Sequence, residues 1–307
     1  MGIPIAEPLE GGCITMKLAK DYVALGGGTS WPEGKRIAVM LTFNFDLEYL
    51  RKTRAESKGR KAGFSDISRG QYGREEGLPR ILKMLKAQNV PATFFVPGIV
   101  AEKYPDDVKK IAEAGHELAC HGYEHEMDRS MTTEQCHEIM EKSEALLEGI
   151  CGKKPVGYRG PGGVIPKTMP AVLEQRGYLY DSSLMDRDWA YLWDPDDFEG
   201  VSQDAKIVEF PSDVMLDDFT YFFFTYSDPA VRSMYTNREV INAWRDEFDA
   251  LVAEGDKILV LKLHPHMIGR GSRVNALGEL VAYMKARGAW FASCAEVAAY
   301  VKNQEVE

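Results

Sequence analysis

The amino-acid sequence predicts an α/β fold and, within that class, a β/α barrel. From Arg36 onward, apolar runs typical of buried strands alternate with amphipathic segments typical of helices, which is the order of βαβ units. Polar residues follow directly after several apolar runs, where such barrels gather their functional side chains. An open, doubly wound sheet is the alternative. The barrel is favoured because a closed ring lets side chains from many strand ends converge, whereas an open sheet gathers them at one switch point.

The first strand is expected at Arg36–Leu47, a run rich in β-forming residues. The segment Glu48–Tyr72 is charged and irregular, and its length is typical of a binding lid. Residues 1–35 are rich in Gly and Pro and are expected to form an N-terminal arm before a single domain at residues 36–307. The aromatic segment Leu216–Tyr226 is expected to form a subunit interface or a pocket wall. Further strands are expected at residues 92–97, 116–120, 207–211, 257–264 and 290–293, and helices at residues 75–88, 105–114, 133–149, 167–176, 238–254 and 277–287.

Charge and composition exclude several classes of protein. Lys+Arg 37 against Asp+Glu 47 gives a formal net charge of −10, and no long basic run occurs, so neither a nucleic acid nor an anionic membrane is an expected partner. No run of about 18 apolar residues and no signal-peptide pattern is present. The cysteines are odd in number and lack C-x-x-C spacing, as reduced thiols do, which predicts a cytoplasmic protein; they are Cys13, Cys120, Cys136, Cys151 and Cys294.

Two histidines four residues apart, His121 and His125, follow the expected strand at residues 116–120. Imidazole nitrogens at this spacing can share one Zn²⁺ ion, although such a pair can equally consist of ordinary histidines. The pair also fits the H-x-x-E-H pattern of a metallopeptidase group, with Glu124 as general base on a continuous helix. Gly122 weakens a helix interior and the preceding run is typical of a strand, so a loop after a strand end is the better interpretation.

Five motifs follow one another along the chain: Asp46 at the end of a strand, His121–His125, Arg159–Gly163, Asp181–Leu184 and Leu261–Pro265. In this order they resemble the polysaccharide deacetylase family, also called the NodB-homology or carbohydrate esterase 4 family. Five motifs in order are far more specific than any one of them. The matching residues are His121 and His125 for H-x-x-x-H, Arg159, Pro161 and Gly163 for R-x-P-x-G, and Leu261 and His264 for L-x-x-H.

Three further patterns, Trp31–Arg36, Ser68–Gly70 and Gly77–Arg80, resemble one branch of this family, which contains peptidoglycan deacetylase-like proteins, cyclic-imide hydrolases and allantoinase-like members. The resemblance implies a distorted barrel of about seven parallel strands and hydrolysis of a carbon–nitrogen bond other than a peptide bond. It also implies one divalent metal ion, expected to be Zn²⁺, and a homo-oligomer, either a dimer or a tetramer. Allantoinase-like members lack an intact metal triad, whereas here the expected ligands are all present; they are Asp46, His121 and His125.

The expected chemistry follows from these residue types. One carboxylate and two imidazoles leave positions on Zn²⁺ for a water nucleophile and for a substrate carbonyl. Arg159 is suited to orient a carboxylate by two hydrogen bonds, with an ordinary ion pair as the alternative, and His264 is suited to protonate the leaving nitrogen. Pro161, Tyr123 and Arg270 are expected beside Arg159 in the substrate site.

The general base is the point at which the sequence departs from the family. The metal-dependent deacetylases that it resembles carry two adjacent aspartates after the first strand, a base and a metal ligand, and here Phe45 precedes Asp46. The amide of Asn44 has no basic site near neutral pH. Glu48 lies two residues beyond Asp46 and faces the same side if the chain stays extended. Glu48 is therefore predicted as the base, with Asp213 as the next candidate.

Together these features predict a metal-dependent deacetylase or amidohydrolase that acts on a small amide, a cyclic imide or an N-acetylated sugar. Cell-wall polymers lie outside the membrane, so small cytosolic amides are the preferred substrates for a protein without an export signal. Two alternatives remain open. One is a sugar- or metal-binding module that has the fold without the chemistry, and the other is an H-x-x-E-H metallopeptidase.

Overall fold

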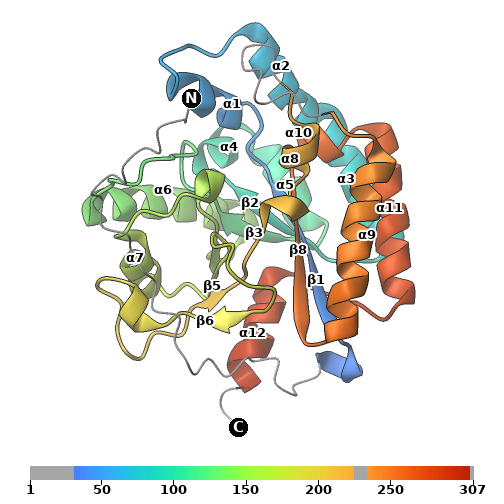
Figure 1. The fold of residues 1–307 in the computed structure, drawn as a ribbon. Coiled ribbons are helices and arrows are strands. Elements are labelled where there is room, and N and C mark those ends of the chain that lie inside the picture. The colour runs from blue at the N-terminus through green and yellow to red at the C-terminus, as the bar shows by residue number, and fades with distance from the viewer. Residues whose placement is uncertain (1–30, 225–233, 305–307) are drawn as a thin grey trace, which may run out of the picture.

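The computed structural model describes residues 31–224 and 234–304, which form one curved sheet with helices around it (Figure 1). The strand order is β6-β7-β5-β4-β3-β2-β1-β8, and β9 also pairs with β1. Within the described ranges, β6 and β7 form the antiparallel pair and the other pairings are parallel. The strands are β1 (Ile37–Asn44), β2 (Thr93–Val96), β3 (Glu117–Cys120), β4 (Gly157–Tyr158), β5 (Tyr180–Asp181), β6 (Tyr191–Leu192), β7 (Val208–Glu209), β8 (Lys257–Leu263) and β9 (Trp290–Phe291).

The strand β1 lies between β2 and β8 and is buried along its whole length. Its apolar side chains face both sides of the sheet, as expected for a parallel strand that is covered on both faces. Beyond β7, the chain returns to β8 through a parallel bridge between Asp217 and Lys262. The mostly parallel sheet is thereby curled into a distorted β/α barrel, which confirms the predicted fold class.

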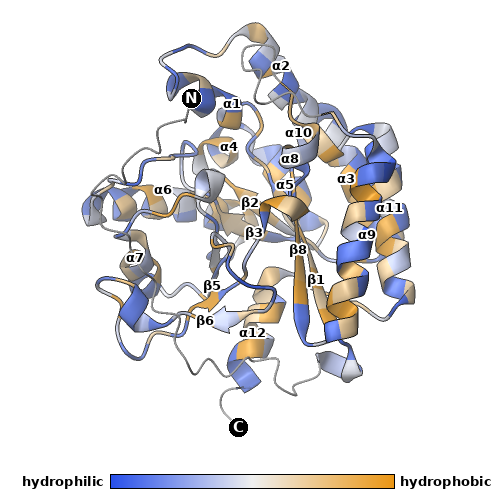
Figure 2. Cartoon of the chain, viewed as in Figure 1, coloured by the Kyte–Doolittle hydropathy of each residue, from blue (hydrophilic) through white to orange (hydrophobic). Residues whose placement is uncertain are grey.

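The helices pack their apolar faces toward this sheet. Figure 2 shows β1 and β8 as predominantly apolar, whereas α9 and α11 carry both apolar and hydrophilic residues. On α9 the buried residues recur at helical spacing, from Val240 through Trp244 and Phe248 to Leu251. The helices are α1 (Tyr49–Glu56), α2 (Phe64–Tyr72), α3 (Leu78–Gln88), α4 (Gly98–Lys103), α5 (Pro105–Glu113), α6 (Thr133–Cys151), α7 (Met169–Gln175), α8 (Asp218–Phe222), α9 (Asn237–Glu254), α10 (Pro265–Ile268), α11 (Gly271–Ala286) and α12 (Cys294–Gln304).

Most of the expected elements are present, and one prediction is wrong. The strands β1, β2, β3, β7, β8 and β9 lie within the expected ranges, and α11 begins at Gly271 rather than at residue 277. Residues 48–72 do not form an irregular loop, because α1 and α2 occupy most of this segment. On α1, the side chains of Leu50, Arg51 and Ala55 are buried, and this tertiary packing stabilises a helix that its charged composition conceals.

Parts of two predictions lie outside the described residues. These are residues 1–30 of the expected arm, with Cys13, and residues Thr225 and Tyr226 of the aromatic segment. At the end of the expected arm, Trp31 is buried and its indole N–H donates a hydrogen bond of 3.0 Å to the carbonyl oxygen of Lys257. The boundary between arm and domain stays a prediction. Among the helices in the described ranges, none has the length and apolar composition needed to span a bilayer.

Candidate active site

Asp46, His121 and His125 come together at the carboxyl ends of β1 and β3. Asp46 lies two residues after the end of β1 at Asn44, and His121 directly follows the end of β3 at Cys120. Asp46 Oδ1 lies 3.3 Å from His121 Nε2, and Asp46 Oδ2 lies 3.8 Å from His125 Nε2. One ligand atom from each residue lies within 4.8 Å of the other two. The structure therefore brings together the three residues that the sequence predicts as metal ligands.

Two residues at this group have a left-handed backbone. His125 has a φ of 66°, and Leu47, directly after Asp46, has a φ of 52°. Such conformations cost a residue with a side chain on the order of 1–3 kcal/mol and are concentrated at functional sites. Gly122 has a φ of 67°, and residues 121–128 form a loop without helix. The metallopeptidase alternative is therefore wrong, because its glutamate must stand on a continuous helix.

The three side chains have the properties of a cation site. All are buried, and both oxygens of Asp46, Nε2 of His121 and both ring nitrogens of His125 have no hydrogen-bond partner in the described part of the chain. Burial raises the pKa of Asp46 to about 7 and lowers the pKa of His125 to about 3. Neutral imidazole is the form that binds a metal, and a buried carboxylate without a partner is costly unless a cation neutralises it. One carboxylate and two imidazoles suit Zn²⁺.

The tautomer of His121 fits this role. Its Nδ1 lies 2.6 Å from the carbonyl oxygen of Arg159. Since a carbonyl oxygen can only accept, Nδ1 carries the proton, and Nε2 keeps its lone pair on the side of Asp46. A hydrogen bond from the second ring nitrogen is how proteins commonly orient a metal-binding histidine.

His264 follows β8 and also approaches Asp46. Its Nε2 lies 3.7 Å from Asp46 Oδ2, and its Nδ1 lies 2.7 Å from Asp218 Oδ1. Asp218 Oδ2 accepts hydrogen bonds from the backbone N–H groups of His264 at 2.9 Å and Ile268 at 3.1 Å. Burial lowers the pKa of His264, but the carboxylates of Asp218, Asp217 and Asp46 together outweigh burial and raise this pKa to about 9. His264 thus carries a proton at neutral pH, as a general acid must.

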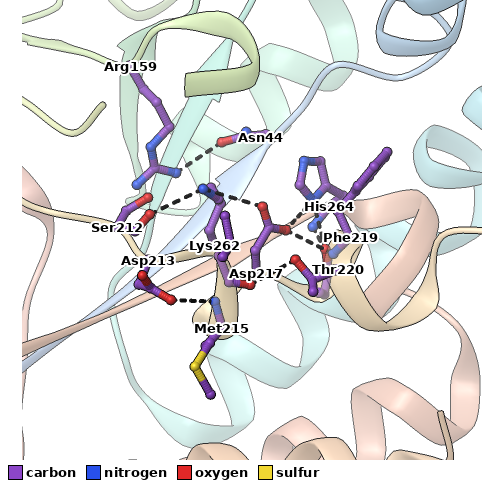
Figure 3. A network of polar contacts seen from close by, with 12 residues as sticks. Asn44, Arg159, Ser212, Asp213, Met215, Asp217, Phe219, Thr220, Lys262 and His264 are labelled. Carbon is purple, nitrogen blue, oxygen red and sulfur yellow. Dashed lines mark hydrogen bonds and ion pairs between the residues drawn. The ribbon is translucent and has the colours of Figure 1, made fainter. Parts of the chain in front are cut away.

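Sequence reasoning missed Asp218 and two further charged residues beside His264. Lys262, two residues earlier on β8, forms an ion pair of 3.3 Å with Asp217 and donates a hydrogen bond of 3.3 Å to the carbonyl oxygen of Ser212 (Figure 3). Asp217 Oδ1 lies 3.6 Å from His264 Nδ1. A lysine inside an apolar strand and a double aspartate before an aromatic segment are the sequence signals that could have revealed these residues.

Arg159 lies buried below the cavity, and its guanidinium is used by the protein itself. Nε and Nη2 donate to the carbonyl and hydroxyl oxygens of Ser182 at 3.0 and 2.8 Å, and Nη1 donates to Thr42 at 2.9 Å. Nη1 also donates to Asn44 at 3.0 Å (Figure 3). These bonds use four of the five N–H donors of a guanidinium. A clamp of two hydrogen bonds on a further carboxylate cannot form beside them, which corrects that prediction, although Arg159 does line the cavity. Arg159 instead joins the ends of β1 and β5.

Glu48 does not reach the metal group. The chain turns after Asp46 instead of staying extended, because Leu47 is left-handed and Glu48 has φ −74° and ψ −15°, a helical conformation. Glu48 Oε1 accepts a hydrogen bond of 2.7 Å from the hydroxyl of Tyr104. The prediction of Glu48 as the base assumes an extended chain after Asp46, and this assumption is wrong.

Asp213 and Pro161 support the cavity from outside. Asp213 accepts a hydrogen bond of 2.6 Å from the backbone N–H of Met215 and thereby caps a 3₁₀ turn (Figure 3). Pro161 is buried beside Gly122, where an added Cβ would lie 3.2 Å from the proline ring. Neither residue lines the cavity. The predictions of Asp213 as a candidate base and of Pro161 as a substrate contact are therefore corrected.

Tyr123 and Arg270 point to other parts of the molecule. The hydroxyl of Tyr123 donates to Glu102 on α4. The guanidinium of Arg270 stacks on Tyr72, 3.5 Å from its ring centre, and is exposed before α11. Both predictions of a substrate contact are corrected, because neither side chain lines the cavity.

A cavity of about 190 Å³ opens beside the metal group. Its polar residues include Asn44, His125, Arg159, Lys262 and His264, and its apolar walls include Leu50, Met127, Met185, Val214 and Phe219. Pockets for drug-sized ligands measure about 300–1,000 Å³, so this cavity suits a small molecule or one unit of a larger one. Phe219 belongs to the aromatic segment, for which the prediction of a pocket wall is confirmed.

Comparison with known proteins shows which proteins the chain is similar to. Residues 64–180 match the sequence profile of the family described as polysaccharide deacetylase. A Helicobacter pylori protein named peptidoglycan deacetylase is 32% identical over 223 residues, which make up 67% of this chain and 76% of that protein. A solved Mycobacterium smegmatis structure, assigned as a polysaccharide deacetylase, has 34% identity and a TM-score of 0.81, covering 90% of this chain and 94% of that one. The PuuE allantoinase structure has 27% identity and a TM-score of 0.75, covering 88% of this chain and 91% of that one.

A distorted, mostly parallel β/α barrel that gathers carboxylate and imidazole groups at its strand ends has the arrangement in which barrel enzymes place their active sites. The identity and coverage shared with the Helicobacter pylori relative show the family. The chain belongs to the polysaccharide deacetylase family and is an enzyme of that family.

Proposed function

We propose that this chain is a metal-dependent hydrolase of a carbon–nitrogen bond other than a peptide bond. The observation that carries the proposal is the convergence of Asp46 and His125 with His264 beside one cavity. The names of its relatives, a peptidoglycan deacetylase and an allantoinase, support hydrolysis at an amide or a cyclic ureide. The substrate that we propose is a small amide, a cyclic imide or a single N-acetylated sugar unit.

Asp46, His121 and His125 are the residues that would hold the ion. When bound, a divalent cation supplies a Lewis acid for the substrate carbonyl and lowers the pKa of water to about 7. The chain contributes a fixed set of donors. The carbonyl oxygen of Arg159 orients His121, and the left-handed backbone at His125 turns its imidazole toward Asp46.

His264 supplies the proton that the leaving nitrogen needs. An amide nitrogen leaves poorly unless it is protonated, and a positioned acid accelerates such a step by about 10²- to 10⁴-fold. Asp218 binds Nδ1 and the backbone N–H of His264, so the proton on Nε2 faces the side of Asp46. The Nε2 proton therefore faces the position that the leaving nitrogen would occupy if the substrate carbonyl bound beside Asp46.

The size of the cavity supports a small substrate. A volume of about 190 Å³ does not enclose a polymer, although it accommodates one ring. An N-acetylated sugar unit is the second candidate, because the name of the Helicobacter pylori relative describes deacetylation of peptidoglycan. A cytoplasmic location and a homo-oligomeric state are part of the same proposal.

A panel of substrates tests the proposed function. Zinc-reconstituted protein is assayed on cyclic imides, ureides, N-acetylglucosamine oligomers, and formyl and acetyl amines. We expect turnover of at least one class and a decrease of about 10²- to 10⁴-fold in His264→Gln. The matched control is His137→Gln on α6, which removes a histidine that does not line the cavity and is hydrogen-bonded to Gln175. Zinc binding without turnover on any class would favour the binding module instead.

A further inference from the structure

We propose that the substrate carries a carboxylate and that the guanidinium of Arg54 binds this group at the wall of the cavity. The proposal rests on the proposed hydrolase function for the identity of the site, but it assigns a residue that the chemistry above does not use. Leu50 and Arg54 lie one turn apart on α1, and both line the cavity. Since α1 starts directly after Asp46 and Glu48, the position of Arg54 is fixed relative to the metal group.

The guanidinium of Arg54 is oriented by aromatic rings and keeps its donors free. It lies 5.1 Å from the ring centre of Phe223 and 5.8 Å from that of Phe219. Cation–π contacts of this kind hold the side chain without using its N–H groups. In the described part of the chain, Arg54 takes part in ring contacts but in no ion pair and no hydrogen bond from its side chain.

The other cations that line the cavity are already engaged. Arg159 donates four hydrogen bonds to protein oxygens, and Lys262 is paired with Asp217 at 3.3 Å. Arg54 is therefore the lining cation whose N–H fork is available. A planar guanidinium recognises a carboxylate by two parallel N–H···O bonds, which is the geometry that Arg159 cannot offer.

The surroundings of Arg54 carry an excess of positive charge. Arg51 and Arg69 lie in the same corner, and burial followed by the charge of Arg69 lowers the pKa of Arg51 to about 10. Asp66 offsets this charge in part, at 3.7 Å from Arg51. In this corner the three guanidinium groups of Arg51, Arg54 and Arg69 outnumber the carboxylate of Asp66. Asp217, the carboxylate that lines the cavity, is already paired with Lys262 at 3.3 Å. A local excess of positive charge favours the binding of an anion and has little effect on the binding of a neutral ligand.

The shape of the cavity sets the rest of the substrate. The walls contributed by Leu50, Met127 and Met185 are apolar, and methionine side chains adapt to the outline of a bound group. A volume of about 190 Å³ admits a short compound with its amide near His264 and its carboxylate near Arg54. Carboxylate-bearing ureides, cyclic imides and N-acyl amino acids have this form, whereas an unsubstituted ring has no group for Arg54.

Calorimetric binding of a matched pair of ligands tests the proposal. The probes are hydantoin and hydantoin-5-acetate, which share one ring and differ by a carboxymethyl group, and the protein is the zinc-loaded full chain at low salt. We expect the parent to bind hydantoin-5-acetate at least about tenfold more tightly than hydantoin. Arg54→Gln is expected to lower the affinity for the acetate by about 10- to 100-fold and to leave hydantoin binding unchanged. Arg54→Lys, which keeps the charge but not the fork, should lie between the two.

The control variant is Arg60→Gln, which removes the same charge from an exposed position after α1. It should retain the preference for the acetate. Equal binding of the two probes by the parent, including no binding of either, overturns the proposal, and so does a preference that survives in Arg54→Gln. Because binding is measured without turnover, these results are separate from the assay panel. Turnover without a preference for the anion rejects Arg54 alone, and a preference without turnover rejects the hydrolase alone.

Discussion

Asp181 on β5 and Glu209 on β7 are register partners whose buried carboxyl groups are hydrogen-bonded to each other. Asp181 accepts from the hydroxyl of Ser183 at 2.8 Å, and Glu209 accepts from the backbone N–H of Leu184 at 2.9 Å. The hydroxyl of Ser183 in turn accepts from the N–H of Gly160 at 2.8 Å. The pair therefore anchors the loop after β5, which contributes Ser182, Ser183 and Met185 to the cavity.

Because of this pair, we expect the free energy of unfolding to decrease as the pH rises. Burial raises the pKa of Asp181 and raises that of Glu209 well above its usual value. In the folded protein the two groups therefore keep a proton that the unfolded chain releases above about pH 4. Their contribution to the free energy of unfolding is fully present below the unfolded pKa values and is lost as the pH rises through the folded ones. Urea unfolding between about pH 5 and pH 9 should show this decrease.

The variant Asp181→Asn isolates this effect. Its amide N–H can replace the shared proton permanently, so its free energy of unfolding should decrease less steeply with pH than that of the parent. The difference between the two curves removes the contribution of other titrating groups. Parallel curves would show that the pair does not hold a proton in this pH range.

Replacing Glu48 should have a small effect on turnover. If Glu48 were the general base, as the sequence predicts, Glu48→Gln would lower kcat by at least about 10²-fold, the lower end of general base contributions. In the structure Glu48 accepts a hydrogen bond from Tyr104, and a glutamine oxygen can accept the same bond. We therefore expect kcat to stay well within tenfold of the parent, measured on a confirmed substrate with equal metal content. A decrease of 100-fold or more would restore Glu48 as the base.

Replacing Asp218 should lower kcat strongly and leave metal binding intact. Asp218→Asn is isosteric, but its amide cannot stabilise a protonated His264 as the carboxylate does. We expect kcat to decrease by about 10²- to 10⁴-fold while KM changes little, because the proton transfer belongs to the transition state. Circular dichroism and metal analysis show whether the variant is folded and loaded. A folded, loaded variant with the kcat of the parent would exclude His264 as an acid positioned by Asp218.

Metal binding should be measurable without an assay of activity. We expect about one divalent ion per chain by elemental analysis and a lower melting temperature after chelation, since a ligand that binds the folded state stabilises it. His121→Ala should lose the ion and the response to chelator, whereas His137→Ala should keep both. If the parent holds no metal even after reconstitution, the role of Asp46, His121 and His125 as ligands is wrong.

The elements that sequence reasoning located are those with a strong local signal. The strand β8 is a nearly continuous apolar run, and His121 and His125 are recognisable by their spacing together with the four other motifs that occur in order along the chain. The predicted position of the Glu48 side chain is wrong because period-two alternation holds only for an extended chain. The φ of 52° at Leu47 ends the extended conformation, and a leucine gives no indication of it in the sequence. A single turned residue was enough to redirect the side chain.

Long-range contacts explain the other errors. The guanidinium of Arg159 bonds to Thr42 and Asn44, which are 117 and 115 residues away in sequence, so its engagement could not be foreseen from neighbouring residues. Arg54 was missed for the opposite reason. An arginine in a charged segment is usually interpreted as a solvated side chain. The packing of α1 beside Phe219 and Phe223, which the sequence does not indicate, places Arg54 at the cavity.

The division of the cavity between strand ends and connecting segments has an evolutionary consequence. Two polar residues of the cavity, Asn44 and His264, stand at the ends of β1 and β8, where the backbone is held by the parallel ladder. Leu50, Met127 and Val214 come from three separate segments between strands. Selection can therefore exchange one of these three side chains at a time, and so move a lineage from one amide to another, without disturbing the inherited reaction.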